Sequence, residues 1–371
     1  MGNAQGNVKV VVNLPGKPSY DVRMGSGLLG TLGGKVKECL PDCTKVALVT
    51  DTNVAPLYAA DAKASLKAAG MKVVEVAIPA GEQSKSLAVV GELWQALAQQ
   101  GLDRASCVVA LGGGVVGDIA GFVAATYLRG IGLVQVPTSL LAMVDSSVGG
   151  KTGIDLPTGK NLVGTFKQPA YVLADTATLD TLPEREWASG LGEVAKCAVI
   201  DSDDFFFWLQ ESAGALRQHD ADAVRDAIAR CVVFKADVVA RDEEERAGVR
   251  ACLNYGHTLA HAIEKLAGYG TYSHGAAVAE GMRFAVRLAV ALADAPVELV
   301  EAQDELLEAL GIEELDFSTP AAEVMDAMRS DKKALDGAVR FVLPRDVGDW
   351  VVAEAPDDVL LEHLEAWARS K

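Results

Sequence analysis

The chain has 371 residues, of which 50% are apolar and 6% aromatic, and its formal net charge is −17. This length is enough for two domains, each with a hydrophobic core of its own, and the composition is typical of an ordinary soluble α/β protein. The strongly acidic balance argues against a nucleic-acid backbone or an anionic membrane surface as the main partner, because both are polyanions.

The first half alternates short β-branched runs with helical patterns. Its strand candidates are 9–14, 45–50, 72–78, 106–111, 133–137 and 170–175. Ala-rich periodic segments such as 84–100 lie between several of them. Alternation of this kind predicts a mainly parallel sheet with helices on its faces.

From about residue 184 the pattern changes to long Ala/Leu/Glu-rich helices. Examples are 221–245, 256–267 and 275–293, and a short strand-like pair follows at 340–344 and 349–354. We therefore predict an α/β domain over residues 1–182 and a mainly α-helical domain over residues 183–371. Because no low-complexity linker separates the halves, we expect a wide interface with a cleft between the domains.

The cysteines and the first residues of the chain indicate the cellular compartment. The six cysteines form no C-x-x-C pair, which is typical neither of a disulfide framework nor of a thiolate zinc site. We expect reduced thiols in a cytoplasmic protein. The chain opens with no charged-then-apolar leader, so we expect no signal peptide.

The segment "VVALGGGVVGDIAG" (108–121) places four glycines between a strand pattern and a helix pattern. Glycine lets a phosphate approach the backbone N–H groups, and the following helix offers its N-terminal dipole to an anion. The string fits G-x-G-x-x-G, but no acidic residue follows about 20 positions later to hold a ribose. It favours a dinucleotide pyrophosphate outside the usual Rossmann arrangement, and a plain tight turn is the alternative.

The segment 144–164, "VDSSVGGKTGIDLPTGKNLVG", is rich in glycine and carries Lys151 and Lys160 beside Asp145 and Asn161. Its glycines disfavour both helix and strand, so we expect a loop. Lysines on such a loop suit an anionic substrate with phosphate or carboxylate groups. A solvated hairpin is the alternative.

Three of the five histidines, His257, His261 and His274, fall in one short window. His257 and His261 are four residues apart on a predicted helix, so both point the same way. Neutral imidazoles together with a carboxylate suit zinc or a related divalent ion. Spacing alone therefore selects His257 and His261 as the ligand pair.

Several charged side chains lie among apolar residues. "GLGEVAK" (190–196) places Glu193 and Lys196 on one helix face, and Lys235 and Arg250 lie in similar surroundings. A cation there needs a carboxylate or a bound anion as its partner. The alternatives are a surface ion pair and long side chains that reach the solvent.

Six segments together resemble one known family. They are "PAGEQSKS" (79–86), "LGGGVVGDIAGFVAATYLRGI" (111–131), "VPTSLLAMVDSSVGGKTGID" (136–155), "GKNLVGTFKQP" (159–169), "LPEREWASGLGEVAK" (182–196) and "NYGHTLAHAIE…SHGAAVAEGM" (254–282). They are similar to the 3-dehydroquinate synthases, the shikimate-pathway members of the sugar phosphate cyclases, and the similarity covers essentially the whole chain.

The resemblance implies conversion of 3-deoxy-D-arabino-heptulosonate 7-phosphate to 3-dehydroquinate and phosphate. It implies bound NAD, used catalytically, and one divalent metal ion, zinc or cobalt. The implied sequence is oxidation of a secondary alcohol, elimination of phosphate, re-reduction and intramolecular aldol closure. The implied domains are a nucleotide-binding N-terminal one and a metal- and substrate-binding C-terminal one, with the active site in the interdomain cleft.

The resemblance also implies the site residues. The metal ligands would be Glu193, His257 and His274, which frees His261 for proton transfer and overrules the spacing argument. The other catalytic and substrate-binding residues would be Asp145, Lys151, Lys196, Lys235, Arg250, Asn161, Asn254, Arg129 (reaching across a homodimer interface) and one of Lys332 and Lys333. The cofactor-binding residues would be Asp51, Asn53, Ala80, Gly81, Glu82, Gln83, Ser84, Lys85, Gly114, Val115, Val116, Gly117, Asp118, Thr138, Ser139, Lys151, Lys160, Thr178, Leu179, Asp180 and Thr181.

Three alternatives remain at this point. Cyclases that form inososes or valiolones share the scaffold, but Asn254 and His261 match the dehydroquinate-forming pattern. Metal-dependent polyol dehydrogenases share the architecture, but the lysine-rich anion site argues against them. A non-catalytic nucleotide-binding subunit is the third, although every matched functional position is intact.

Overall fold

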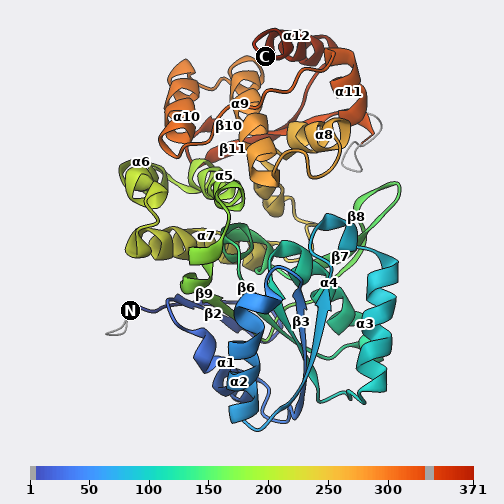
Figure 1. Ribbon diagram of the computed structural model, residues 1–371. Coiled ribbons are helices and arrows are strands. Elements are labelled where there is room, and N and C mark those ends of the chain that lie inside the picture. The colour runs from blue at the N-terminus through green and yellow to red at the C-terminus, as the bar shows by residue number, and fades with distance from the viewer. Residues whose placement is uncertain (1–5, 331–337) are drawn as a thin grey trace. The chain divides into compact units, whose positions relative to one another are not determined.

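The computed structural model describes residues 6–330 and 338–371 (Figure 1). The chain divides into two compact units. Unit 1 comprises the residues up to Pro183 together with Lys235–Glu244, and unit 2 comprises Glu184–Phe234 and Glu245–Lys371.

Within the described residues, unit 1 contains a seven-stranded sheet with the strand order β1-β2-β9-β6-β5-β3-β4. Its strands are β1 (Val8–Val12), β2 (Tyr20–Gly25), β3 (Lys45–Asp51), β4 (Lys72–Ile78), β5 (Cys107–Gly112), β6 (Gly132–Pro137) and β9 (Tyr171–Asp175). The β1–β2 pair is antiparallel and the other neighbouring pairs are parallel. The predicted mainly parallel sheet is confirmed.

Helices cover both faces of this sheet: α1 (Leu32–Cys39), α2 (Ala60–Ala68), α3 (Leu87–Gln99) and α4 (Gly114–Thr126) (Figure 1). In β3, Val46 and Leu48 pack into one core with α1 and α2, whereas Ala47 and Val49 pack into a second core with α3 and α4. Because both faces of the strand are buried, its sequence is a continuous apolar run and not an alternating one.

The winding of the chain reverses between β3 and β5. The chain passes from β3 to β4 through α2 on one face, and from β5 to β6 through α4 on the other. In doubly wound sheets, ligands bind outside the carboxyl ends of the strands at such a reversal. The loops after Asp51 and Gly112 are therefore the expected ligand position in unit 1.

Much of the segment expected as a loop is a β-hairpin, formed by β7 (Lys151–Leu156) and β8 (Gly159–Phe166). The expectation of a loop, drawn from glycines that disfavour strand structure, is therefore wrong for these residues. A Cβ on Gly153 would lie 2.7 Å from the carbonyl oxygen of Val163. Glycine here allows the two strands to approach closely, so the hairpin alternative describes the conformation correctly.

Short helical segments make most of the remaining connections in unit 1. They are η1 (Leu29–Thr31), η2 (Ala55–Ala59), η3 (Glu82–Ser84), η4 (Tyr127–Arg129), η5 (Ala142–Ser146) and η6 (Thr176–Thr181). Across the described ranges, every helix is too short or too polar to cross a lipid bilayer.

Unit 2 is mainly helical. Its elements are α5 (Glu184–Asp201), α6 (Asp203–Arg217), the first part of α7 (Ala221–Arg241), η7 (Val249–Asn254), α8 (His257–Ala267), α9 (His274–Leu292), α10 (Val297–Ala309), α11 (Ala321–Arg329), α12 (Asp357–Arg369) and the antiparallel pair β10 (Arg340–Asp346) and β11 (Asp349–Glu354). The helices predicted at 256–267 and 275–293 and the late strand pair are confirmed. The helix predicted at 221–245 ends earlier, at Arg241.

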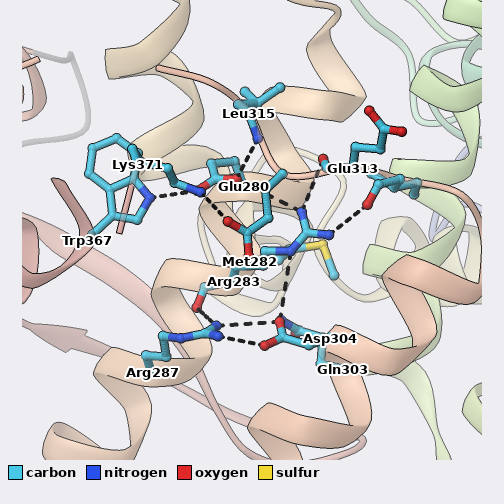
Figure 2. Close-up of polar contacts among 12 residues, drawn as sticks. Glu280, Met282, Arg283, Arg287, Gln303, Asp304, Glu313, Leu315, Trp367 and Lys371 are labelled. Carbon is cyan, nitrogen blue, oxygen red and sulfur yellow. Dashed lines mark hydrogen bonds and ion pairs between the residues drawn. The ribbon is translucent and has the colours of Figure 1, made fainter. Parts of the chain in front are cut away.

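Helix α9 is fixed by a buried polar network (Figure 2). The Glu280 carboxylate, which is fully buried, accepts hydrogen bonds from Trp367 Nε1 at 2.6 Å and from the Leu315 backbone N–H at 3.2 Å. It also forms an ion pair with Lys371 Nζ at 2.6 Å. One turn further on, Arg283 donates to the carbonyl oxygen of Ile312 at 2.7 Å. The C-terminal helix is thereby attached to the helix that begins at His274.

Candidate active-site residues

Three side chains of unit 2 converge as a candidate metal site. One donor atom from each of Glu193, His257 and His274 lies within 4.8 Å of the other two. Glu193 Oε1 is 3.8 Å from His257 Nε2 and 3.6 Å from His274 Nε2. The residues come from α5, from the first turn of α8 and from the first turn of α9, so three helices supply one donor each.

Glycines next to these ligands allow the three helices to meet. A Cβ on Gly192 would overlap the backbone of Gly275, and a Cβ on Gly275 would overlap the carbonyl group of Ser189. Just before α8, a Cβ on Gly256 would lie 2.5 Å from the carbonyl oxygen of Val278 in α9. Larger residues at these positions would separate the helix backbones, and the ligand next to each glycine would move with them.

The surroundings of Glu193 fit a divalent cation. Its side chain is 1% exposed. Oε2 is paired with the Lys196 ammonium at 2.5 Å, whereas Oε1 accepts no hydrogen bond within the described part of the chain. A buried carboxylate oxygen without a donor is costly. A carboxylate facing two imidazole nitrogens is a donor set that zinc and similar ions prefer.

The charged pair in "GLGEVAK", Glu193 and Lys196, is deeply buried. Lys196, which is 2% exposed, forms an ion pair with Glu193 Oε2 at 2.5 Å and donates to the carbonyl oxygen of Leu253 at 2.9 Å. Lys235 and Arg250 are 5% and 2% exposed. The readings of these cations as surface pairs or solvent-reaching side chains are therefore wrong.

The structure separates His261 from the candidate ligand set. Its ring lies 5.6 Å from that of His257, edge to face, so the predicted shared helix face is correct. The ring of His274, from another helix, lies 5.2 Å from that of His257, and it is His274 that completes the converging group. The ligand pair chosen on spacing alone is not the set that the structure brings together.

In unit 1, Lys235 Nζ donates to the Asp145 side chain at 2.8 Å and to its backbone carbonyl oxygen at 2.5 Å. The predicted substrate residues Asp145 and Lys235 are thus direct neighbours. Lys151 begins β7 opposite Phe166, and Lys160 lies near the turn at the other end of the hairpin.

Two predicted residues of unit 1 have unusual backbones. Arg129 has a φ of 67° and follows Leu128, whose φ is 49°, and Asn161 has a φ of 54°. Non-glycine residues in this region cost free energy, and such strain concentrates at functional sites.

Apart from Lys151 and Lys160 in the β7–β8 hairpin, the predicted cofactor residues lie at or after the carboxyl ends of parallel strands. Asp51 ends β3, residues 80–85 follow β4, residues 114–118 follow β5, Thr138 and Ser139 follow β6, and residues 178–181 follow β9. Loops at one edge of a parallel sheet lie together, and this edge includes the reversal between β3 and β5. The valine side chain of Val116, in contrast, is fully buried in the core beneath α4.

A polar cluster occupies part of this edge. Lys85 Nζ donates to Asp118 at 2.8 Å and to Asn161 Oδ1 at 2.5 Å, and Lys160 lies 3.5 Å from Glu82. Burial opposes the charged form of Lys85, but Asp118 and Glu82 outweigh it and raise the lysine pKa. Burial raises the pKa of Asp118 although Lys85 opposes the shift.

Two predicted residues lie outside the part of the chain that the structure describes, and one residue near the candidate site was not predicted. Lys332 and Lys333 lie outside the described residues. Glu264, whose Oε2 is 3.6 Å from His274 Nδ1, was not predicted. It stands seven residues after His257, two turns along the same helix face, and that spacing is the signal that could have found it.

Comparisons with known proteins identify the family of the chain. Residues 75–189 match the family model described as 3-dehydroquinate synthase N-terminal, and residues 190–334 match the one described as 3-dehydroquinate synthase C-terminal. The 3-dehydroquinate synthase of Desulforamulus reducens is 48% identical over 334 residues, which are 90% of this chain and 92% of the relative.

Solved structures of related cyclases share the fold. A 2-deoxy-scyllo-inosose synthase complexed with carbaglucose-6-phosphate, NAD⁺ and Co²⁺ superposes with a TM-score of 0.87 at 25% identity, covering 97% of this chain and 99% of the other. The 2-epi-5-epi-valiolone synthase of Streptomyces hygroscopicus, with NAD⁺ and Zn²⁺ bound, gives a TM-score of 0.85 at 26% identity, with coverage of 96% and 98%. The matched models and the identity to the curated relatives show that the chain belongs to the 3-dehydroquinate synthase family.

Proposed function

We propose that this chain is an active 3-dehydroquinate synthase, a carbon–oxygen lyase that converts 3-deoxy-D-arabino-heptulosonate 7-phosphate to 3-dehydroquinate and phosphate. The observation that carries the proposal is the convergence of Glu193, His257 and His274 beside the buried Lys196, in a chain whose curated relatives have this activity in their names.

In this proposal Glu193, His257 and His274 hold a zinc or cobalt ion. Support comes from Glu193 Oε1, which accepts no hydrogen bond within the described residues, and from the two imidazole Nε2 atoms that face it. In this proposal NAD occupies the carboxyl edge of the sheet in unit 1, where Gly112–Gly114 form the junction of β5 and α4 and the N-terminus of α4 suits a pyrophosphate. When bound, these groups supply Lewis acidity toward a substrate oxygen and a reversible hydride acceptor.

The chain's own residues bind the anionic substrate and move its protons. Lys151, Lys196, Lys235 and Arg250 are the proposed partners of its phosphate and carboxylate. Three of these cations are buried, and their attraction to an anion is therefore weakly screened. We assign proton transfer to an imidazole nitrogen of His261, because imidazole titrates near neutral pH and the metal ligand set does not include this residue.

We further propose a cytoplasmic homodimer in which Arg129 reaches the neighbouring subunit. The strained backbone at Leu128 and Arg129 supports a functional role for this turn, in addition to its connecting α4 to β6. The division into a nucleotide-binding domain over 1–182 and a metal- and substrate-binding domain over 183–371 also stays a prediction, as does the interdomain location of the active site.

The test is an assay of phosphate release from the heptulosonate phosphate with catalytic NAD. We expect stoichiometric phosphate and 3-dehydroquinate without net formation of NADH. Glucose 6-phosphate, a sugar phosphate without a carboxylate, serves as the matched comparison, since an inosose-type cyclase would prefer it. A reaction that stops once all the NAD has become NADH would instead identify a polyol dehydrogenase. Turnover of glucose 6-phosphate without turnover of the heptulosonate phosphate would identify another cyclase.

A further inference from the structure

The two imidazoles of the candidate metal site have similar surroundings on the side away from Glu193. His257 Nδ1 lies 3.1 Å from the backbone carbonyl oxygen of Tyr255. His274 Nδ1 lies 3.6 Å from Glu264 Oε2. In both rings, therefore, Nε2 faces Glu193 and Nδ1 faces an oxygen acceptor. This arrangement suits the tautomer with its proton on Nδ1, in which the Nε2 lone pair is free for a ligand.

The acceptors differ in charge. His257 faces a neutral carbonyl oxygen, whereas His274 faces a carboxylate that is 7% exposed. Glu264 projects from α8, the helix that begins with His257, toward the first turn of α9. A negative charge at the N-terminal end of α9 is also favoured by the helix dipole.

We propose that Glu264 is a positioning residue that holds His274 in the tautomer and orientation needed for metal binding. The inference rests on the proposed metal site. Glu264 touches neither the substrate nor the metal in this scheme; it acts through the Nδ1 side of His274. A carboxylate in this place orients the imidazole and makes its Nε2 a stronger donor, and removing such a partner typically weakens metal binding about 10–100-fold.

A structural role alone would give a different result. If Glu264 only supported the packing of α8 on α9, its removal would lower the stability of the protein without changing the affinity of the folded fraction for a metal. A positioning role predicts weaker metal binding in a protein that is still folded. Metal affinity is therefore the measurement that separates the two, and it needs no enzymatic turnover.

The experiment titrates Co²⁺ into the metal-free full chain and follows the visible absorption of the bound ion. Glu264→Ala should bind Co²⁺ about 10–100-fold more weakly than the original protein. Glu264→Gln should show a smaller loss, because an amide oxygen in this place can accept a hydrogen bond from Nδ1 but lacks the charge. Glu308→Gln removes the same charge from an exposed position on α10 and is the matched control; its affinity should not change.

Circular dichroism first establishes that each variant is folded. If Glu264→Ala does not fold, Glu264→Gln, which keeps the side-chain volume, gives the answer. Affinity within about twofold of the original protein in the folded variants would overturn the positioning role. His257→Ala separates this outcome from failure of the proposed function: if Co²⁺ binding to the original protein does not depend on His257, the metal site itself is wrong.

Discussion

Replacing Lys196 with methionine removes the positive charge of the buried pair and keeps most of the side-chain volume. Both members of the pair are almost fully buried, and Nζ lies 2.5 Å from Glu193 Oε2. Removing one partner of a buried ion pair leaves the other charge uncompensated, which costs about 3–5 kcal/mol. For a folding unit of this size, 1 kcal/mol corresponds to about 2–4 °C, so the melting temperature of unit 2 should fall by about 6–20 °C in metal-free protein.

The metal dependence of this loss tests the site. A divalent ion at Glu193 would compensate the carboxylate in place of Lys196, so added Zn²⁺ should recover much of the stability of Lys196→Met. Trp187, Trp208, Trp350 and Trp367 lie in unit 2, so tryptophan fluorescence follows its unfolding. Lys265→Met, at an exposed position of α8, is the control and should change stability by less than about 1 kcal/mol. An equal loss for Lys196→Met with chelator and with Zn²⁺ would refute the reasoning.

Three further predictions concern activity and metal content. Chelation should abolish turnover and added zinc or cobalt should restore it, whereas full activity in protein verified as metal-free would contradict the site. Lys151→Ala, at an exposed position, should leave folding unchanged and lower kcat/KM by a factor that corresponds to about 2–4 kcal/mol; an unfolded variant whose folded fraction keeps normal specific activity would make this lysine structural. His261→Ala should keep its metal and lose about 10²–10⁴-fold in rate, whereas His274→Ala should lose metal affinity, and elemental analysis of both purified variants distinguishes this from the reverse pattern.

The fold of unit 1 was largely predictable because its strands are buried on both faces. The runs 46–49 and 107–111 are continuously apolar, and the structure places them in β3 and β5. Strand β2, Tyr20–Gly25, was not predicted because "YDVRMG" carries two charges and is only partly apolar. The hairpin at Lys151–Phe166 was not predicted for a different reason. Glycine propensity is a local quantity, whereas the close approach at Gly153 depends on the partner strand.

The order of the strands in the sheet could not be predicted from the sequence. Alternation of strands and helices predicts parallel pairing, but it does not say on which side of β3 the next strand adds. That choice decides where the winding reverses, and with it where the loops after Asp51 and Gly112 meet. The cofactor residues came instead from the resemblance, and the sheet explains why segments so far apart in sequence can serve one ligand.

The histidines show why spacing alone chooses the wrong partner. Two side chains four residues apart on a helix lie one above the other along its axis, as His257 and His261 do. Three donors around one ion must instead point to a common centre, and separate helices reach it more readily from different directions. Here the third direction comes from α9, whose first turn is brought against α5 because Gly192 and Gly275 lack side chains. The glycines next to Glu193 and His274 therefore allow His274 to join the converging group, and the spacing of the histidines does not predict this.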